Sequence, residues 1–271
     1  MYKNKEWLKE QFDKYGTVTE VSRQTGYPRT NISRYAKKYE LYTPKKRNSK
    51  IKVNKDYFKE INTSDKAYFL GFIMADGYMY KRTENLYRFG LKIKSSDDDI
   101  IKKLCTYIDY PLEKIVYRNQ ERNGTISELV EIQINDQTFC SHLINLGIIP
   151  KKSGKEIMPN CNGYEIDFIR GFIDGDGWVY RHSCSTGQDR FAIGCCSSSL
   201  SILKSIQVYI KHNLSIDMHI SERLGVYKCE NASKYKVFKL LNRIYYDNCL
   251  SLDRKNKTAQ EIRKEIYDEL F

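Results

Sequence analysis

Two nine-residue segments of this chain are similar and lie 100 positions apart. Residues 69–77 read FLGFIMADG and residues 169–177 read IRGFIDGDG, so each segment ends in an aspartate and a glycine. The same order of strand and helix patterns follows each segment. A long repeat that occurs only twice indicates two copies of one αββαββ unit, because a solenoid needs three or more copies.

Small residues recur at four-residue spacing inside both segments: Gly71 and Ala75 in the first, Gly171 and Gly175 in the second. On a helix, positions four apart share one face, so each segment would present a smooth strip on which another helix can lie closely. Glycine inside a helix costs about 1 kcal/mol, which such close packing would offset. The sequence therefore predicts that the two segments are paired helices related by a pseudo-twofold axis.

The paired helices would end side by side and bring the carboxylates of Asp76 and Asp176 together. Mutual repulsion and the negative end of each helix dipole would raise both pKa values unless a cation were present. Oxygen ligands favour Mg²⁺, with Mn²⁺ as a substitute, and such a metal beside a phosphodiester activates water and stabilises the leaving 3′ oxygen. The alternative is a pair of ordinary turn residues, since Asp-Gly is common in turns, but their duplication favours the metal site.

With these features the two segments resemble the paired motifs of single-chain LAGLIDADG homing endonucleases, over about residues 62–260. The resemblance implies an α+β fold in which two αββαββα repeats form a pseudo-twofold saddle of antiparallel sheets. It also implies a monomeric pseudo-dimer that straddles a long double-stranded DNA target and cleaves both strands. It assigns metal binding to Asp76 and Asp176, assisted by the carbonyl groups of Ala75 and Gly175.

Two positions depart from the family pattern. Met74 stands where the second motif has Asp174, but family members do not use this residue for metal. Arg170 occupies a position that is usually small, and we expect its side chain to point away from the seam between the two helices.

The family also often places a basic residue near the scissile phosphate. The segments IPKKSG (149–154) and LDRKNK (252–257) each follow the last helix of their repeat. Lys152 and Lys255 are therefore predicted to support the transition state or its water network, and Lys94, at a strand end, is a further catalytic candidate. The alternative is that each is a solvated surface lysine.

Strand alternation predicts that one face of the first sheet is basic. In RFGLKIK (88–94) apolar and basic side chains alternate, and in the strand 128–134 Glu131 and Gln133 point outward. In the second repeat Arg190, Ala192 and Gly194 point outward and carry less charge. A merely solvated sheet face is the alternative. The predicted DNA contacts of the two repeats are Tyr78, Tyr80, Arg82, Arg88, Lys92, Lys94, Arg118, Glu131, Gln133, Tyr180, His182 and Arg190.

Residues 5–41 contain three short helical patterns separated at Gly16 and at 26–28. Their apolar positions would share one small core, and a tight glycine turn joins the second pattern to the third. This segment resembles a helix-turn-helix module, and an ordinary three-helix cap with a basic face is the alternative. The predicted base-reading residues of the third helix are Arg29, Thr30, Asn31, Ser33 and Arg34.

A basic segment with little apolar periodicity follows from residue 42 to about residue 59. We interpret it as a linker whose Lys45, Lys46 and Arg47 contact DNA phosphates, although a charge run is often only solvated. The predicted domains are a helix-turn-helix module (1–43), a linker (44–60), a first repeat (61–158) and a second repeat (159–271).

Charge and composition limit the class of protein. The chain has 46 Lys and Arg against 34 Asp and Glu, a net charge of +12, which favours nucleic acid over an anionic membrane as partner. No apolar run approaches the roughly 18 residues of a membrane span, and the start MYKNKEWLKE lacks a signal-peptide core, so we expect a cytoplasmic protein of a bacterial or phage-infected cell or an organelle. The 8 cysteines form no C-x-x-C pair, so zinc spacing is missing and reduced, mostly buried thiols are expected.

The sequence thus predicts a site-specific, Mg²⁺-dependent DNA endonuclease, either free-standing or encoded in an intron. The alternatives on the same scaffold are a non-cleaving DNA-binding regulator and an intron RNA maturase. An intein is not expected, because the terminal residues that splicing requires are missing from the chain.

Overall fold

The computed structural model describes residues 1–41, 51–84, 86–122, 124–183 and 189–270. The predicted phosphate contacts Lys45, Lys46 and Arg47 lie outside these residues. The chain divides into two compact units, Met1–Lys50 and Ile51–Phe271. Each unit has a separate hydrophobic core.

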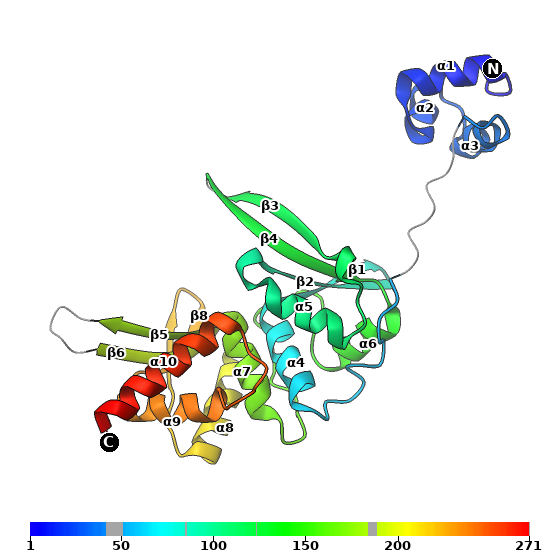
Figure 1. Ribbon diagram of the computed structural model, residues 1–271. Helices are drawn as coiled ribbons and strands as arrows, with labels where there is room; N and C mark the ends of the chain where they lie inside the picture. The colour runs from blue at the N-terminus through cyan, green and yellow to red at the C-terminus, as the bar shows by residue number, and fades with distance from the viewer. Residues whose placement is uncertain (42–50, 85, 123, 184–188, 271) are drawn as a thin grey trace. The chain divides into compact units, whose positions relative to one another are not determined.

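Three short helices make up the N-terminal unit: α1 (Lys5–Tyr15), α2 (Val18–Thr25) and α3 (Arg29–Lys38) (Figure 1). The side chains of Asn4 and Thr17 accept hydrogen bonds from the first turns of α1 and α2, which fixes where these helices begin. Gly26 ends α2 in the left-handed conformation that glycine favours, at φ 72°. The buried residues of this unit are Leu8, Val18, Val21, Ile32 and Ala36.

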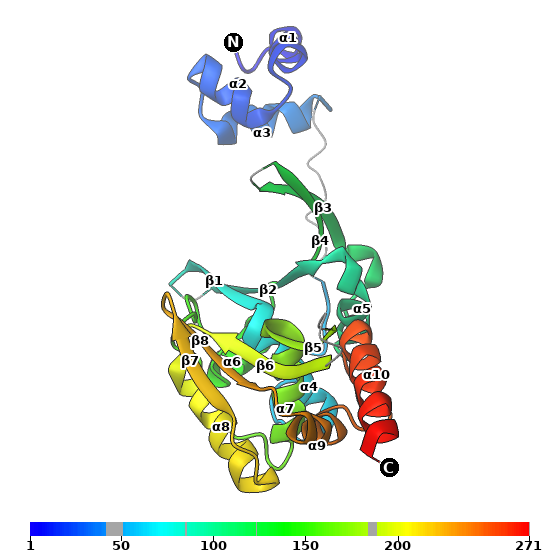
Figure 2. The same cartoon turned by 90° about the vertical axis from the view of Figure 1, so that its left-hand side faces the viewer.

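The second unit contains the two predicted repeats in the predicted element order (Figures 1 and 2). The first repeat consists of α4 (Ser64–Asp76), β1 (Gly77–Thr83), β2 (Leu86–Lys94), α5 (Asp98–Tyr107), β3 (Val116–Arg122), β4 (Thr125–Ile134) and α6 (Gln137–Asn145), with 3₁₀ turns at Ser95–Asp97 and Leu112–Lys114. The second consists of α7 (Glu165–Asp176), β5 (Gly177–Ser183), β6 (Asp189–Ser197), α8 (Leu200–Leu214), β7 (His219–Arg223), β8 (Val226–Asn231) and α9 (Lys234–Ile244).

Each repeat forms one antiparallel four-stranded sheet, in the orders β1-β2-β4-β3 and β5-β6-β8-β7. The helices cover one face of each sheet, and the buried apolar positions of the strands point toward them. The mixed α+β architecture predicted from the sequence is therefore observed.

Helices α4 and α7 pack against each other more extensively than any other pair of described elements. A Cβ atom at Gly71 would lie 2.0 Å from the backbone oxygen of Phe168, and a Cβ atom at Gly171 would lie 2.0 Å from that of Tyr68. The second contact is the first with the two repeats exchanged, because 100 residues separate Gly71 from Gly171 and Tyr68 from Phe168. A pseudo-twofold axis between the helices requires this relation. Both glycines are needed because any side chain would hold the backbones apart.

Arg170, at the position that is usually small, is fully buried. Its guanidinium donates hydrogen bonds to the backbone oxygens of Leu250 (2.7 Å) and Ile244 (2.9 Å) and to Asp167 Oδ1 (2.6 Å). All three acceptors belong to the second repeat, so the side chain ties α7 to the segment after α9, and the glycine contacts of the seam remain intact.

Two segments differ from the sequence-based description. Residues 51–60, described above as linker, lead into the main core, where Tyr57 and Phe58 are buried. The helix α10 (Asp253–Leu270) was not predicted, and its residues Ala259, Ile262 and Ile266 also join the core. Isolated aromatic residues and a helix rich in charged residues give weak periodic signals, which explains both differences.

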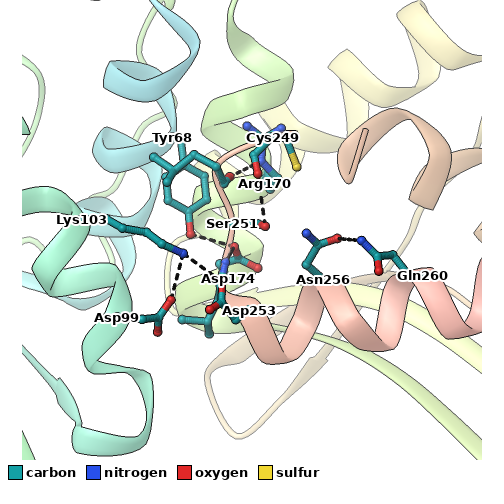
Figure 3. A network of polar contacts seen from close by, with 12 residues as sticks. Tyr68, Asp99, Lys103, Arg170, Asp174, Cys249, Ser251, Asp253, Asn256 and Gln260 are labelled. Carbon is teal, nitrogen blue, oxygen red and sulfur yellow. Dashed lines mark hydrogen bonds and ion pairs between the residues drawn. The ribbon is translucent and has the colours of Figure 1, made fainter. Parts of the chain in front are cut away.

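The segment before α10 and its first turn connect the second repeat to the first (Figure 3). Lys103 on α5 forms ion pairs with Asp99 (3.1 Å) and, across the repeats, with Asp253 (2.9 Å). Arg254 donates two hydrogen bonds, of 2.8 and 3.1 Å, to the carboxylate of Asp97. These contacts hold the start of α10 against the first repeat.

Candidate nuclease site

The C-terminal ends of α4 and α7 bring together the two aspartates that the repeated segments predict. A Cβ atom at Gly175 would lie 2.4 Å from Ala75 Cβ and 3.2 Å from Asp76 Oδ2, so the last turns of the two helices touch. Asp76 and Asp176 are the final residues of their helices, and both side chains are partly buried. The structure therefore places the two carboxylates side by side at the end of the seam.

Burial and charge perturb both acids. Burial, and secondly the charge of Asp176, raise the pKa of Asp76 to about 6, while Lys255 and Lys152 oppose the shift. Burial also raises the pKa of Asp176, and Lys152 is the strongest opposing charge. The metal-free site thus holds two acids that cannot both ionise at low cost.

Lys152 and Lys255 lie at the ends of the two seam helices and bond their last carbonyl groups. Lys152 Nζ donates to the backbone oxygens of Met74 (2.6 Å) and Ala75 (2.9 Å). Lys255 Nζ donates to those of Ile173 (2.6 Å), Asp174 (2.7 Å) and Gly177 (2.7 Å). Cations at helix C-termini satisfy carbonyl groups that have no partner within the helix, so both lysines also have a structural role.

On the Lys255 side of the site, the seam helix α7 itself carries a buried acid. Asp174 is buried and accepts hydrogen bonds from Tyr68 Oη (2.8 Å), Tyr245 Oη (2.7 Å) and the backbone N–H of Leu252 (2.7 Å). Figure 3 shows Tyr68 reaching Asp174 from the other repeat. The first repeat has the apolar Met74 at the corresponding position, so the two ends of the seam differ chemically.

A different acid, Glu156, lies near Lys152 and was not singled out in the sequence. It is 6% exposed, and its Oε2 atom has no hydrogen-bond partner among the described residues. Burial lowers the pKa of Lys152, and the charge of Glu156 opposes this shift more than that of Asp176 or Asp76 does. Glu156 also raises the pKa of Asp176, so its carboxylate acts on both sides of the site.

The donor set suits Mg²⁺, which proteins often bind through one or two carboxylates while phosphates and water complete the shell. Asp76 and Asp176 supply such a pair, and a cation would stabilise the charged forms that burial, and at Asp76 also the charge of Asp176, disfavour. The carbonyl group of Ala75, a predicted metal ligand, already accepts a hydrogen bond from Lys152. Lys255 bonds the carbonyl groups of Asp174 and Gly177 and not that of Gly175, the other predicted carbonyl ligand. Among the residues that the structure describes, no group of three or more His, Cys, Asp or Glu side chains is placed to hold a metal.

Lys94 is not brought to the carboxylates. It is exposed at the end of β2, and its charge is not among those that shift the pKa of Asp76 or Asp176. The structure instead places it on the outer face of the first sheet, opposite Leu129 in the register.

The outer face of the first sheet, away from the helices, is strongly basic. The strand register places on it Tyr78, Tyr80, Arg88, Gly90, Lys92, Lys94, Val116, Arg118, Gln120, Thr125, Ser127, Leu129, Glu131 and Gln133. Arg82 is exposed and lies where the pairing of β1 with β2 is irregular. Glu131, a predicted DNA contact, is largely covered. It is 7% exposed and accepts hydrogen bonds from Tyr78 Oη (2.5 Å) and Gln133 Nε2 (2.8 Å). Tyr78 can cover it because Gly90 leaves room for the tyrosine ring.

The outer face of the second sheet is less basic, as the strand pattern predicts. The register places on it Trp178, Tyr180, His182, Arg190, Ala192, Gly194, Cys196, His219, Ser221, Arg223, Val226, Lys228 and Glu230. Ala192, predicted to face outward, is buried. Trp178 and Lys228 were missed, although Trp178 follows Asp176 just as Tyr78 follows Asp76 and lies over Gly194 as Tyr78 lies over Gly90.

In the N-terminal unit, four of the five predicted base-reading residues line one shallow cleft on α3. The lining residues are Arg29, Thr30, Ser33, Arg34 and Lys37, of which Lys37 was not predicted. Asn31 is partly buried and does not line the cleft. The cleft carries three cations and no acid, so it suits a polyanion.

Metal-free protein is expected to lose stability as pH rises through the pKa of Asp76. Because folding raises this pKa from 3.8 to about 6, the folded state keeps a proton that the unfolded chain releases. The contribution is full below about pH 4 and is lost as pH rises through about 6. Asp76→Asn should therefore raise the free energy of unfolding by about 2 kcal/mol at pH 7.5 in EDTA, and by less at pH 5.

Urea unfolding at the two pH values measures this difference. Asp268→Asn, an exposed acid on α10, removes the same charge far from the pair and should leave the free energy of unfolding unchanged. Equal effects of the two substitutions would contradict the raised pKa of Asp76, which burial and the charge of Asp176 cause.

Comparison with known proteins gives matches in structure alone. No protein-family model matches the sequence, and no curated protein matches it. The LAGLIDADG meganuclease I-AabMI bound to uncleaved DNA superposes with a TM-score of 0.52 at 12% identity, covering 77% of this chain and 92% of that chain. The meganuclease I-SmaMI bound to uncleavable DNA superposes with a TM-score of 0.51 at 11% identity, covering 74% of this chain and 89% of that one.

No described helix is both long and apolar enough to cross a membrane. In this chain the fold consists of two repeats, two antiparallel sheets and a central helix pair that ends in Asp76 and Asp176. On this structural similarity, the chain has the fold of the LAGLIDADG homing endonucleases.

Proposed function

We propose that this protein is a site-specific DNA endonuclease that requires Mg²⁺, acts as a monomeric pseudo-dimer and cleaves both strands of its target. The observation that carries the proposal is the meeting of Asp76 and Asp176 at the end of the glycine seam. Two neighbouring, partly buried acids whose pKa values are both raised by burial are unfavourable without a cation, and they recur in both repeats. A scaffold that only bound DNA would have no need of them.

The outer faces of the two sheets would bind the DNA. Exposed Lys92 and Arg118 give the first face positive charge, and Arg190 and Lys228 contribute on the second. An antiparallel ribbon fits the major groove, where side chains read base edges while cations contact phosphates. Because the faces differ in charge and composition, the two half-sites are expected to differ in sequence.

The chain's own groups would then act on the scissile phosphates. Asp76 and Asp176 would hold the cation, and a bound Mg²⁺ would stabilise the charge that develops on the leaving 3′ oxygen. Hydrolysis forms a bond from a water oxygen to phosphorus and breaks the bond to O3′, which takes up a proton and leaves a 5′ phosphate. Lys152 and Lys255 would supply positive charge beside the reacting groups.

Cleavage of a DNA pool tests the proposal. The substrate is a plasmid pool with a randomised insert of about 20 base pairs, the length of a ~65 Å saddle at ~3.4 Å per base pair. With Mg²⁺ the protein should linearise a subset of inserts that share one sequence, and EDTA should stop the reaction. Selective binding of inserts without any cut would instead favour a non-cleaving regulator, and binding of RNA alone would favour a maturase.

The N-terminal unit would extend the DNA contact through the cleft on α3. Removing residues 1–50 should weaken binding of the selected target by about 10-fold or more and leave the position of the cuts unchanged, because the second unit has its own core. Gel-shift titration and mapping of the cut ends measure both quantities. As a control, the full chain with Arg29→Ala and Arg34→Ala should reproduce part of this loss of affinity. If the truncated protein and this double variant both bound the target like the wild-type protein, the N-terminal unit would not contribute to DNA binding.

A further inference from the structure

Glu131 is a buried acid on the basic outer face of the first sheet, where a carboxylate would by itself repel a polyanion. It accepts hydrogen bonds from Tyr78 Oη (2.5 Å) and Gln133 Nε2 (2.8 Å). Burial acts to raise the pKa of Glu131, but these two hydrogen bonds outweigh it and hold the pKa below its ordinary value. Glu131 is therefore a charged carboxylate, which accepts hydrogen bonds and donates none.

This carboxylate fixes the orientation of the Gln133 side chain. An amide has a donor nitrogen and an acceptor oxygen, and only the nitrogen can face a carboxylate. Gln133 Oε1 is therefore free to accept elsewhere, and it accepts a hydrogen bond from Arg88 Nη1 (3.1 Å). Arg88 Nε donates to Asn135 Oδ1 (2.9 Å). Two acceptors of the protein itself thus hold the guanidinium of Arg88 in one orientation.

The remaining donors of Arg88 match the edge of one base. A guanidinium has five N–H donors in a planar fork, and both donors of Nη2 and one of Nη1 have no acceptor among the described residues. Arg88 lies on β2, inside the sheet and not at its edge, and it points to the outer face. In the major groove guanine presents two adjacent acceptors, O6 and N7, whereas adenine presents an acceptor beside a donor.

The second repeat lacks this network. Gly194 lies opposite Trp178 just as Gly90 lies opposite Tyr78, which aligns the two sheets. In place of Arg88, Glu131 and Gln133, the register then gives the second sheet Ala192, Lys228 and Glu230. An arrangement that the fold itself required would recur in both repeats. Its presence in one repeat alone therefore points to a feature of the ligand.

We propose that Arg88 reads a guanine in the half-site bound by the first repeat, and that Glu131 is a positioning residue that orients Arg88 through Gln133. The inference rests on the DNA-binding part of the proposed function. The N–H groups of Arg88 that the protein leaves free donate to O6 and N7 of this guanine. The second half-site has no equivalent requirement, because Ala192 has no donor to offer a base.

Selection of DNA by binding tests this assignment. The wild-type protein and its variants bind the randomised inserts in Ca²⁺, and sequencing of the bound DNA gives the base preference at each position. The wild-type protein should prefer guanine at one position of one half-site. Arg88→Ala should lose that preference, bind the guanine duplex about 10-fold or more weakly, and keep the preferences elsewhere. Glu131→Gln keeps the size of the side chain but lets either end of the Gln133 amide face it, so the preference should weaken at the same position only.

Arg190→Ala is the matched control, because it removes the same group from the outer face of the second sheet and should leave this guanine preference unchanged. A preference at one position does not depend on the fraction of folded protein. Equal weakening of all inserts by Arg88→Ala would identify a phosphate contact and overturn the inference. A full guanine preference in Glu131→Gln would overturn the positioning role.

The same proteins separate this inference from the proposed function. A wild-type protein that selects the guanine but cuts no DNA in Mg²⁺ removes the nuclease function alone. A wild-type protein that cuts selected inserts without preferring guanine at any position that Arg88→Ala changes removes the inference alone.

Discussion

Asp176→Asn is expected to reduce double-strand cleavage by more than about 1000-fold, which corresponds to about 4 kcal/mol in the activation barrier. The amide keeps the size of the side chain but cannot carry the charge that binds a cation between the two helix ends. Asp76→Asn should have the same effect, because the seam places both acids at one site. A single substitution would therefore stop the cutting of both strands.

Binding separates this outcome from a folding defect. Both variants should retain the affinity of the wild-type protein for the selected duplex within about threefold, since the sheet faces are unchanged and removal of a negative charge favours a polyanion. Cleavage assays in Mg²⁺ and gel-shift titrations in Ca²⁺ measure the two properties. Cleavage at the wild-type rate by either variant would refute the assignment of the acids.

Gly171→Ala is expected to cost about 3 kcal/mol or more of folding stability, because its methyl group would lie 2.0 Å from the Tyr68 backbone oxygen. Neither helix can move aside without disturbing the aromatic residues around the seam. For a unit of this size the loss corresponds to a fall in Tm of about 6–12 °C. Gly71→Ala should behave alike, since it meets Phe168 in the same way.

Gly225→Ala provides the matched control for this prediction. This glycine lies in the turn between β7 and β8 with φ 75°, and a Cβ atom there would have no neighbour within 4 Å. The substitution should cost only the backbone strain of about 1–2 kcal/mol. If thermal unfolding gave equal losses for Gly171→Ala and Gly225→Ala, close helix contact would not be what requires the seam glycines.

The seam and the order of elements could be predicted because their signals are local and duplicated. Gly71 and Gly171 have no other use inside a helix, and each repeat supports the interpretation of the other. The position of Asp76 beside Asp176 followed directly from this symmetry. The alternation in RFGLKIK likewise predicted the basic outer face, because one strand is enough to show it.

Other parts of the site depend on contacts that no short segment contains. Glu156 resembles any acid in a charged loop, and only the fold shows that it is buried with an unpaired oxygen. The carbonyl partners of Lys152 and Lys255 lie about 80 positions away in the chain. Lys228 joins the second outer face only through the register of β8 with β6.

The offset of 100 residues between the two glycine contacts has a consequence for the origin of the chain. A surface that meets its own copy in the same way is an isologous interface, so an ancestral single repeat with this helix could have assembled as a symmetric homodimer. Such a dimer would recognise only palindromic DNA. A single chain that contains both repeats is free of this constraint. Met74 in the first repeat against Asp174 in the second, and Glu156 against Ala259, each four residues after the site lysine of its repeat, are differences that two identical subunits could not show.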